Sequence, residues 1–450
     1  AGLTVRIRGI GTTTNADPLY VVDGIQMTPD EVDFLNPEDI ENFSILKDAS
    51  ATAIYGSKGA NGVVLITTKE GKAGKNRINF KYSFGIQENI RTMDMMNADE
   101  FVQTWNKLVR RSNRIDTNTY KDLYANTNWF DEIFRSAPMH NYYLSISGGN
   151  ENSTYSVSSS YLKQEGIIIN SSFNRLNLRI NSTHKIKDRI TIGEKILLNR
   201  GVRHVVPENN EYQSVLANAI LTDPLSSPYI EEDGEKNWGP TLFSNYRNPV
   251  SLAELGLLTI RPGALYANNH GWDTETQNRL IGNIFAEVEL IKGLKLKSSL
   301  GFKFNYISNY DFLPEYFIEG SDLIEQSKLI KQLEETRYWN WENTATYSKE
   351  IGSHSFTALI GMSAEEFKGE YLNALNAAGP GLENEIPELR YFSYYSDDLS
   401  DRIEGNGEEN SMISYLGRIN YNYDNKFLLT FSVRRDGSSR FGTAYEKNAF

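Results

Sequence analysis

Residues 46–69 read LKDASATAIYGSKGANGVVLITTK, and this stretch decides the fold of the region around it. Its last part, Val63 to Ile66, is apolar without polar alternation, which is typical of a strand buried on both faces. Residues 49–55 predict a short helix closed by Gly56, a residue suited to the left-handed conformation after a helix. Gly59 and Gly62 bracket a tight turn. The stretch therefore predicts a small α+β layer with a buried strand.

The residues upstream extend this layer. Asn36 is followed by Pro37 and two acids, which combines a capping side chain, a first-turn proline and acids at the positive end of the helix dipole. A short helix to about Glu41 and a strand over 43–47 are expected. Asp23-Gly24 is a turn signal, and we prefer this interpretation to a catalytic carboxylate at Asp23.

Composition excludes several classes of function. The chain has 450 residues, with 58 acids against 46 bases, no cysteine, and 26 Tyr, 21 Phe and 6 Trp. A net charge of -12 argues against nucleic acid as a partner. The lack of cysteine removes thiol catalysis and thiolate metal sites. The sequence contains no apolar run of about 18 residues, so no transmembrane helix is expected. This does not argue against a membrane β-barrel, because barrel strands carry a weaker sequence signal.

From about Arg77 onward, apolar and polar residues alternate. Phe427, Leu429 and Phe431, for example, share one face, whereas Thr430 and Ser432 share the other. About eleven strands follow this pattern, over residues 77–88, 139–147, 154–163, 173–184, 189–200, 278–290, 294–309, 337–347, 355–367, 412–424 and 426–435.

The links between these strands are sorted by length. The links after the second, fourth, sixth, eighth and tenth strands are short, and most of the others are long, including 201–277 and 371–411. Outer-membrane barrels have short turns on one rim and long loops on the other. We therefore prefer a large antiparallel transmembrane β-barrel to a soluble sandwich or propeller.

The strand count also indicates which part of a larger protein this is. Plugged transporter barrels have about 22 strands, twice the number expected here. We therefore expect this chain to supply about half of such a barrel.

These motifs resemble the plug of SusC/RagA-type TonB-dependent outer-membrane transporters. The resemblance rests on residues 5–9, 18–24 and 35–69 and, in the barrel, on residues 434–442. Siderophore and vitamin transporters more typically carry a Gly-Pro-containing stretch where this chain has Lys47 to Ala51. The SusC-type assignment is therefore preferred. The resemblance implies a segment from mid-plug to mid-barrel, with the C-terminal part of an α+β plug over 1–74 and the N-terminal half of a barrel over 75–450.

The resemblance implies transport without covalent chemistry. The sequence itself offers no catalytic motif, no metal-ligand spacing and no cofactor fingerprint, so no catalytic residue, metal or cofactor is expected. The resemblance also implies active import of an oligosaccharide or a peptide across the bacterial outer membrane, with a SusD-like lipoprotein as lid and the TonB-ExbB-ExbD complex as energy source. Outer-membrane lipid is an expected partner and nucleic acid is not. The alternatives are a siderophore or chelated-metal receptor and a soluble β-rich binding or adhesion protein.

Two sets of candidate residues follow. The plug signature, expected to be structural or to control gating, comprises Arg6, Arg8, Gly9, Asp23, Gly24, Lys47, Asp48, Tyr55, Gly56, Gly59, Asn61 and Gly62. Six polar residues of the plug would meet polar residues in the barrel lumen, with plug solubility or internal ion pairs as the alternative: Arg6, Arg8, Lys47, Asp48, Lys58 and Asn61. Aromatic residues in the long loops suit sugar rings or peptides, or else pack the loops and lid: Tyr212, Trp238, Tyr246, Trp272, Tyr391, Tyr394 and Tyr395.

Overall fold

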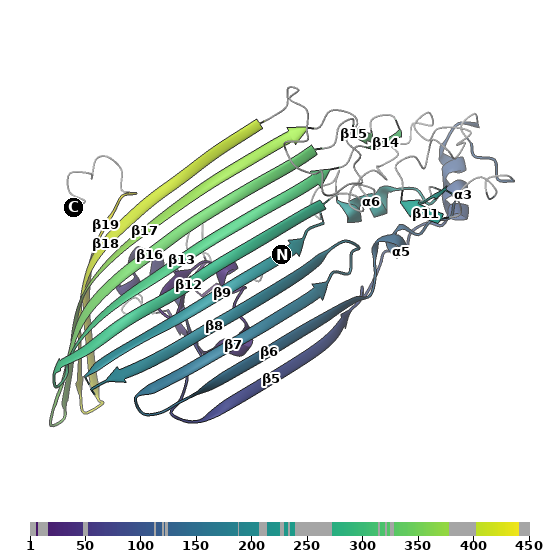
Figure 1. Cartoon of the computed structure of the whole chain (residues 1–450). Coiled ribbons are helices and arrows are strands. Elements are labelled where there is room, and N and C mark those ends of the chain that lie inside the picture. The colour runs from purple at the N-terminus through teal and green to yellow at the C-terminus, as the bar shows by residue number, and fades with distance from the viewer. Residues whose placement is uncertain are drawn as a thin grey trace.

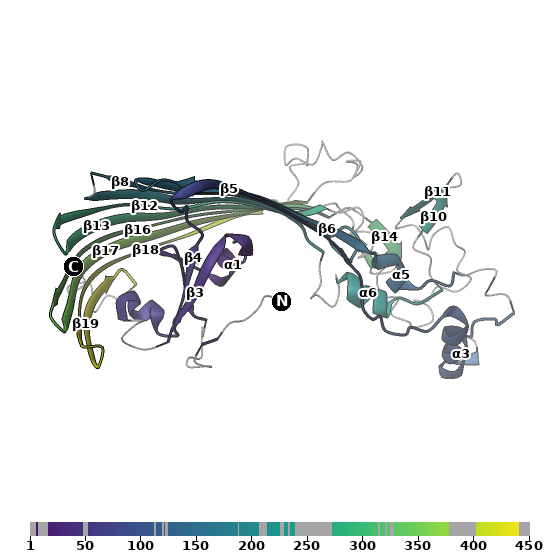
Figure 2. The ribbon, with the colours of Figure 1, turned by 90° about the horizontal axis from the view of Figure 1, so that it is seen from below.

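The computed structural model describes two packed parts, a small sheet and a large sheet that arches over it (Figures 1 and 2). The described residues are 6–7, 17–47, 53–111, 114–118, 121, 125–187, 189–206, 214–225, 229–232, 235–238, 272–313, 316–319, 322–324, 328–377 and 402–440.

The small sheet contains the described part of the stretch 46–69. Its strands are β1 (Leu19–Val22), β2 (Ile25–Met27), β3 (Ile40–Leu46) and β4 (Val63–Thr68), in the order β2-β1-β4-β3. Strand β4 pairs in parallel with β1 and antiparallel with β3. It is largely buried, as its unbroken apolar run predicts.

Three short helices connect these strands: α1 (Pro29–Val32) and the 3-10 helices η1 (Pro37–Asp39) and η2 (Ala53–Gly59). Asn36 caps η1 by accepting from the backbone N–H of Glu38 at 2.9 Å. The helix expected up to Glu41 is shorter, because β3 pairing already begins at Ile40. The helix expected over 49–55 falls partly outside the described residues, and its described part is the 3-10 helix η2.

The large sheet has eleven antiparallel strands, and each strand pairs with its neighbours in chain order. All eleven strands predicted from the alternation are present. Their bounds are β5 (Gly74–Gln87), β6 (Ala137–Gly149), β7 (Ser153–Glu165), β8 (Ser172–Ile186), β9 (Ile190–His204), β12 (Trp272–Ile291), β13 (Leu294–Leu313), β16 (Lys328–Ile351), β17 (His354–Ala377), β18 (Arg402–Tyr423) and β19 (Phe427–Ser438).

Strands β16 to β18 extend well beyond their predicted bounds. The predicted strands begin at Arg337 and Met412, whereas β16 begins at Lys328 and β18 at Arg402. The expected loop over 371–411 is therefore wrong at both ends. Residues 402–409 are exposed on both faces of β18, so no burial imposes an apolar alternation there.

The polarity of the large sheet is the reverse of that in a soluble protein. Its convex face is apolar and exposed, as at Ile78 (72% exposed) and Phe431 (62%). Its concave face is polar and buried under the small sheet, as at Ser158 and Asn181. A soluble sandwich buries apolar faces between two sheets. This single arched sheet with an outward apolar face therefore has the architecture of a transmembrane barrel wall.

The two rims of the wall also differ. At one rim, tight turns such as 292–293 and 352–353 join consecutive wall strands. The long links at the other rim form helices α3 (Ala98–Leu108), α5 (Trp129–Ile133) and α6 (Val215–Leu221) and hairpins of β10 (Tyr229–Glu232) with β11 (Glu235–Trp238) and β14 (Tyr316–Glu319) with β15 (Asp322–Ile324) (Figure 1).

Helix α3 follows Asn97, which forms a capping box with Glu100. Its buried residues Ala98 and Val102 pack with Leu225 and Ile115 in the loop region. None of the helices in the described ranges is both long and apolar enough to span a membrane.

Candidate functional site

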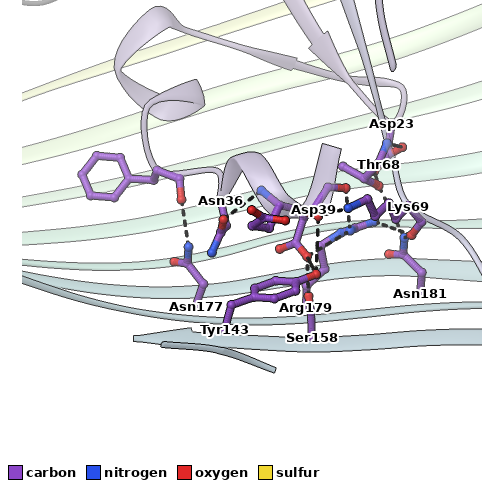
Figure 3. A network of polar contacts seen from close by, with 12 residues as sticks. Asp23, Asn36, Asp39, Thr68, Lys69, Tyr143, Ser158, Asn177, Arg179 and Asn181 are labelled. Atoms are coloured by element: carbon purple, nitrogen blue, oxygen red, sulfur yellow. Dashed lines mark hydrogen bonds and ion pairs between the residues drawn. The ribbon is translucent and has the colours of Figure 1, made fainter. Parts of the chain in front are cut away.

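The polar surface between the small sheet, or plug, and the concave wall is the candidate functional site. Asp39 at the end of η1 is its centre (Figure 3). Its Oδ1 accepts from the hydroxyls of Tyr143 at 3.0 Å and Ser158 at 2.6 Å. Arg179 lies 3.8 Å away, and its guanidinium also donates to the backbone carbonyls of Asp39 and Lys69 at 3.3 and 3.1 Å. We call these five residues the Asp39 seat.

Local sequence explains the geometry of the Asp39 seat. The backbone N–H of Lys69 donates to the carbonyl of Asp39, so Arg179 reaches the point where the start of β3 and the end of β4 meet. Tyr143, Ser158 and Arg179 lie on the neighbouring strands β6, β7 and β8 and face the lumen because side chains alternate along each strand. All of these side chains except that of Lys69 are less than a tenth exposed.

A second contact of the same kind involves Asp23, in the turn between β1 and β2. Its backbone has φ of 50° and that of Gly24 has φ of 90°, which confirms the predicted turn. The carboxylate accepts from Thr68 in β4 and from Lys195 Nζ of β9 at 3.1 Å. Lys195 also lies 2.5 Å from Glu70. Asp23 thus links the turn to the wall.

A third contact joins helix α1 to β13. Glu31 completes the capping box with Thr28, and its two oxygens accept from Lys303 Nζ at 3.0 and 2.9 Å. Asn305 donates to the same carboxylate at 3.3 Å. Burial raises the pKa of Glu31, but attraction to Lys303 and the hydrogen bonds outweigh burial, and the pKa is lowered overall.

Above these contacts lies a cavity of about 1040 Å³ between the plug and the wall. It is lined by the plug residues Thr28, Glu31, Phe34 and Lys58 and by residues of seven wall strands from β8 to β18. Many of its charges are already paired: Lys58 contacts Glu365, and Arg279 stacks 3.7 Å over the ring of Phe34. The cavity is large enough for several sugar or amino-acid units.

Among the described residues, only part of the predicted plug signature reaches this interface. Asp23 reaches the wall, as does Lys58, whereas Asn61 contacts Asp17 within the plug at 3.4 Å. Arg6 and Lys47 are exposed. Glycines at positive φ are Gly24, Gly56 and Gly62; Gly59 is buried, and Tyr55 is half-buried. Arg8, Gly9 and Asp48 lie outside the described residues.

Most of the predicted loop aromatics lie in parts of the chain that the structure does not describe. Tyr212, Tyr246, Tyr391, Tyr394 and Tyr395 lie outside the described residues. The backbone of Trp238 ends β11, and that of Trp272 begins β12, at the rim with the long links.

The Asp39 seat and the pair of Glu31 with Lys303 were missed by sequence reasoning. Their signal was a charged or hydroxyl side chain at an inward position of an alternating strand, as at Arg179 and Lys303. Alternation alone assigns such residues to the polar face and does not pair them with plug residues more than a hundred positions away.

Comparisons with known proteins agree with this geometry. A family profile described as the TonB-dependent receptor plug domain matches residues 1–63. TonB-dependent receptor P3 of Formosa agariphila is 32% identical, over 98% of this chain and 41% of that protein. TonB-dependent receptor SusC of Bacteroides thetaiotaomicron is 28% identical, over 98% and 43%. The chain thus spans about two fifths of the length of these relatives.

Among solved structures, that of the RagAB peptide transporter matches with a TM-score of 0.79 and 26% identity, over 98% of this chain and 51% of that one. The wall, the plug and its seat define this chain as part of a plugged β-barrel of the TonB-dependent receptor class. Within that class it is of the SusC/RagA type.

Proposed function

We propose that the protein containing this chain imports a large nutrient, an oligosaccharide or a peptide, across the bacterial outer membrane in a TonB-dependent manner. The single observation that supports this most strongly is the nature of the surface between plug and wall. Hydrogen bonds and ion pairs dominate it, and only two wall residues, Leu197 and Ile281, join the buried apolar core of the plug among the described residues.

A polar surface of this kind suits a plug that must move. Water replaces the partners of a polar contact when the contact opens, so separation has a smaller cost than separating apolar faces of equal area. The plug can therefore be tightly seated at rest and still be displaced by a pull from the periplasmic side. In this proposal the TonB-ExbB-ExbD complex supplies that pull.

The substrate would enter from the rim that carries the long links and occupy the cavity above the plug. The loop aromatics, including Trp238 and Trp272, are proposed to contact the substrate or a SusD-like lipoprotein that covers the rim. The plug signature residues are proposed to hold the plug or to control its release. Several paired charges and aromatic rings line the cavity, and these groups suit either sugars or peptides.

Uptake by the intact organism tests the proposal. Deleting the gene should abolish growth on one oligosaccharide or peptide source, and disrupting TonB should have the same effect. Purification in detergent should recover a surface lipoprotein with the transporter. Unchanged growth on every such source, or recovery of the full-length protein from the soluble fraction without detergent, would contradict the proposal.

A further inference from the structure

Two stretches that are distant in the sequence meet where η2 packs against β19. Arg434 of β19 points from the wall to the plug, and one guanidinium nitrogen, Nη1, donates to the backbone carbonyl of Ile54. Its Nη2 donates to Ser414 of β18 at 2.9 Å, and its Nε donates to Asp436 at 2.7 Å. Ser414 is fully buried. The guanidinium is thus held by the wall on two sides and offers its third side to the plug.

Gly56 makes this approach possible. Its φ of 63° and ψ of -149° lie in a backbone region that residues other than glycine scarcely adopt. This conformation differs from the left-handed helical one expected from the sequence. A Cβ at this position would also lie 2.8 Å from Asp436 Oδ2 and 2.9 Å from Arg434 Nε. Because Arg434 Nε donates to the other carboxylate oxygen, Asp436 Oδ1, this hydrogen bond holds both side chains in place, and neither can move aside freely.

We infer that Arg434 is a positioning residue that fastens η2 of the plug to the wall, and that Gly56 is glycine to admit it. We call Ile54, Gly56, Ser414, Arg434 and Asp436 the Arg434 latch. The wall residues of the latch lie on β18 and β19, whereas those of the Asp39 seat lie on β6 to β8, so the plug is held at both sides of the arch (Figure 2). The inference rests on the proposed function only in that a transporter must open the latch.

The other end of η2 is fastened separately. Lys58 donates to Gln26 at 3.1 Å and pairs with Glu365, which also accepts from Tyr338 at 2.9 Å. Lys58 is 39% exposed, so solvent screens this pair and it contributes little by itself. The Arg434 latch, with its buried serine and three simultaneous hydrogen bonds, is the stronger fastening of η2.

Cysteine accessibility in the full-length protein tests the latch. The chain has no cysteine, so Tyr55→Cys places a single reporter thiol in this chain beside Gly56. Loss of the charged hydrogen bonds in Arg434→Ala should speed labelling of this thiol by a polar maleimide roughly tenfold. Gly56→Ala should have the same effect, and Arg434→Lys should restore part of the protection because lysine reaches only one acceptor at a time.

Arg418→Ala is the matched control. Arg418 also points inward from β18, but its Nε donates to Asn420 on its own strand, at 3.2 Å, and it has no hydrogen bond or ion pair to a plug residue among those that the structure describes. This variant should label at the wild-type rate. Equal labelling of Arg434→Ala and wild type, or equally fast labelling of Arg418→Ala, would overturn the inference.

Folding and transport are measured separately. Retention of the compact barrel on unheated gels shows that each variant has folded. The labelling experiment uses neither substrate nor TonB, so failure of wild-type import would contradict the proposed function and leave the latch result standing.

Discussion

Asp39 and Arg179 show how one buried pair can hold the plug. Arg179→Met removes the cation and leaves the Asp39 carboxylate buried against the hydroxyl donors of Tyr143 and Ser158. We expect this to weaken plug seating by about 3 kcal/mol, the lower end for a broken buried pair. Limited proteolysis of the folded, detergent-solubilised protein should show faster cleavage within the plug and an intact barrel.

A second substitution separates charge from packing. Asp39→Asn in the Arg179→Met background should recover most of the protection, because no uncompensated charge remains buried. If the double variant is cleaved as fast as Arg179→Met alone, lost contacts to the carbonyls of Asp39 and Lys69 explain the effect instead. Exposed Lys72→Ala, whose partner Glu41 is also exposed, serves as a control with little expected change.

At the same scale, the sequence identified residues that turn the chain and missed residues that join its two parts. Asp23-Gly24 is recognisable because a tight hairpin requires positive φ at both positions. Asp39 gives no such local signal, since an acid at a helix N-terminus has an ordinary explanation. Its role depends on Tyr143 and Arg179, which only the tertiary fold brings near.

At the scale of elements, helix α1 depends on a single side chain for two functions. The Glu31 carboxylate both caps α1 and binds Lys303 on β13, so one group sets the helix start and its attachment to the wall. Because the pKa of Glu31 is lowered in the folded protein, its contribution is complete above the ordinary carboxyl pKa. It is lost as pH falls through the lower, folded-state pKa.

The expected result is a plug that opens more readily in acid. Protease protection of the plug should fall as pH decreases from about 5 to 3, a range that spans the ordinary carboxyl pKa and values below it. Glu31→Gln should weaken seating by about 1–3 kcal/mol at neutral pH and flatten this part of the profile. An unchanged acid profile in Glu31→Gln would assign the pH dependence to another group.

The elements that could be predicted from the sequence are those whose two faces lie in environments of different polarity. The middle of each wall strand lies between an apolar exterior and a polar interior, and alternation located all eleven. The outer ends of β16 and β18 lack this contrast, so their residues looked like loop. Likewise, β4 was found from its unbroken apolar run, whereas the 3-10 geometry of η1 and η2 depends on packing that no local pattern reports.

For the whole molecule, the reversed polarity of the large sheet predicts how much barrel stability changes when a charge is added to its convex face. Leu300 of β13 lies on the convex face and is 43% exposed, whereas its neighbour Ser299 faces inward and exchanges hydrogen bonds with Asn283. If the convex face contacts lipid, Leu300→Arg places a charge in hydrocarbon. Barrel stability should then fall by about 2–4 kcal/mol, the cost found for arginine near the bilayer midplane.

The matched control is Ser299→Arg, one residue away on the opposite face. It places the same charge in the hydrated lumen and should lose only the hydrogen bonds to Asn283, about 1 kcal/mol. Urea unfolding of the full-length protein in lipid vesicles measures both variants. In a soluble sheet the order would reverse, because an arginine is tolerated at an exposed position and costly at an inward one. The sign of the difference between the two variants therefore decides which face of this sheet the membrane covers.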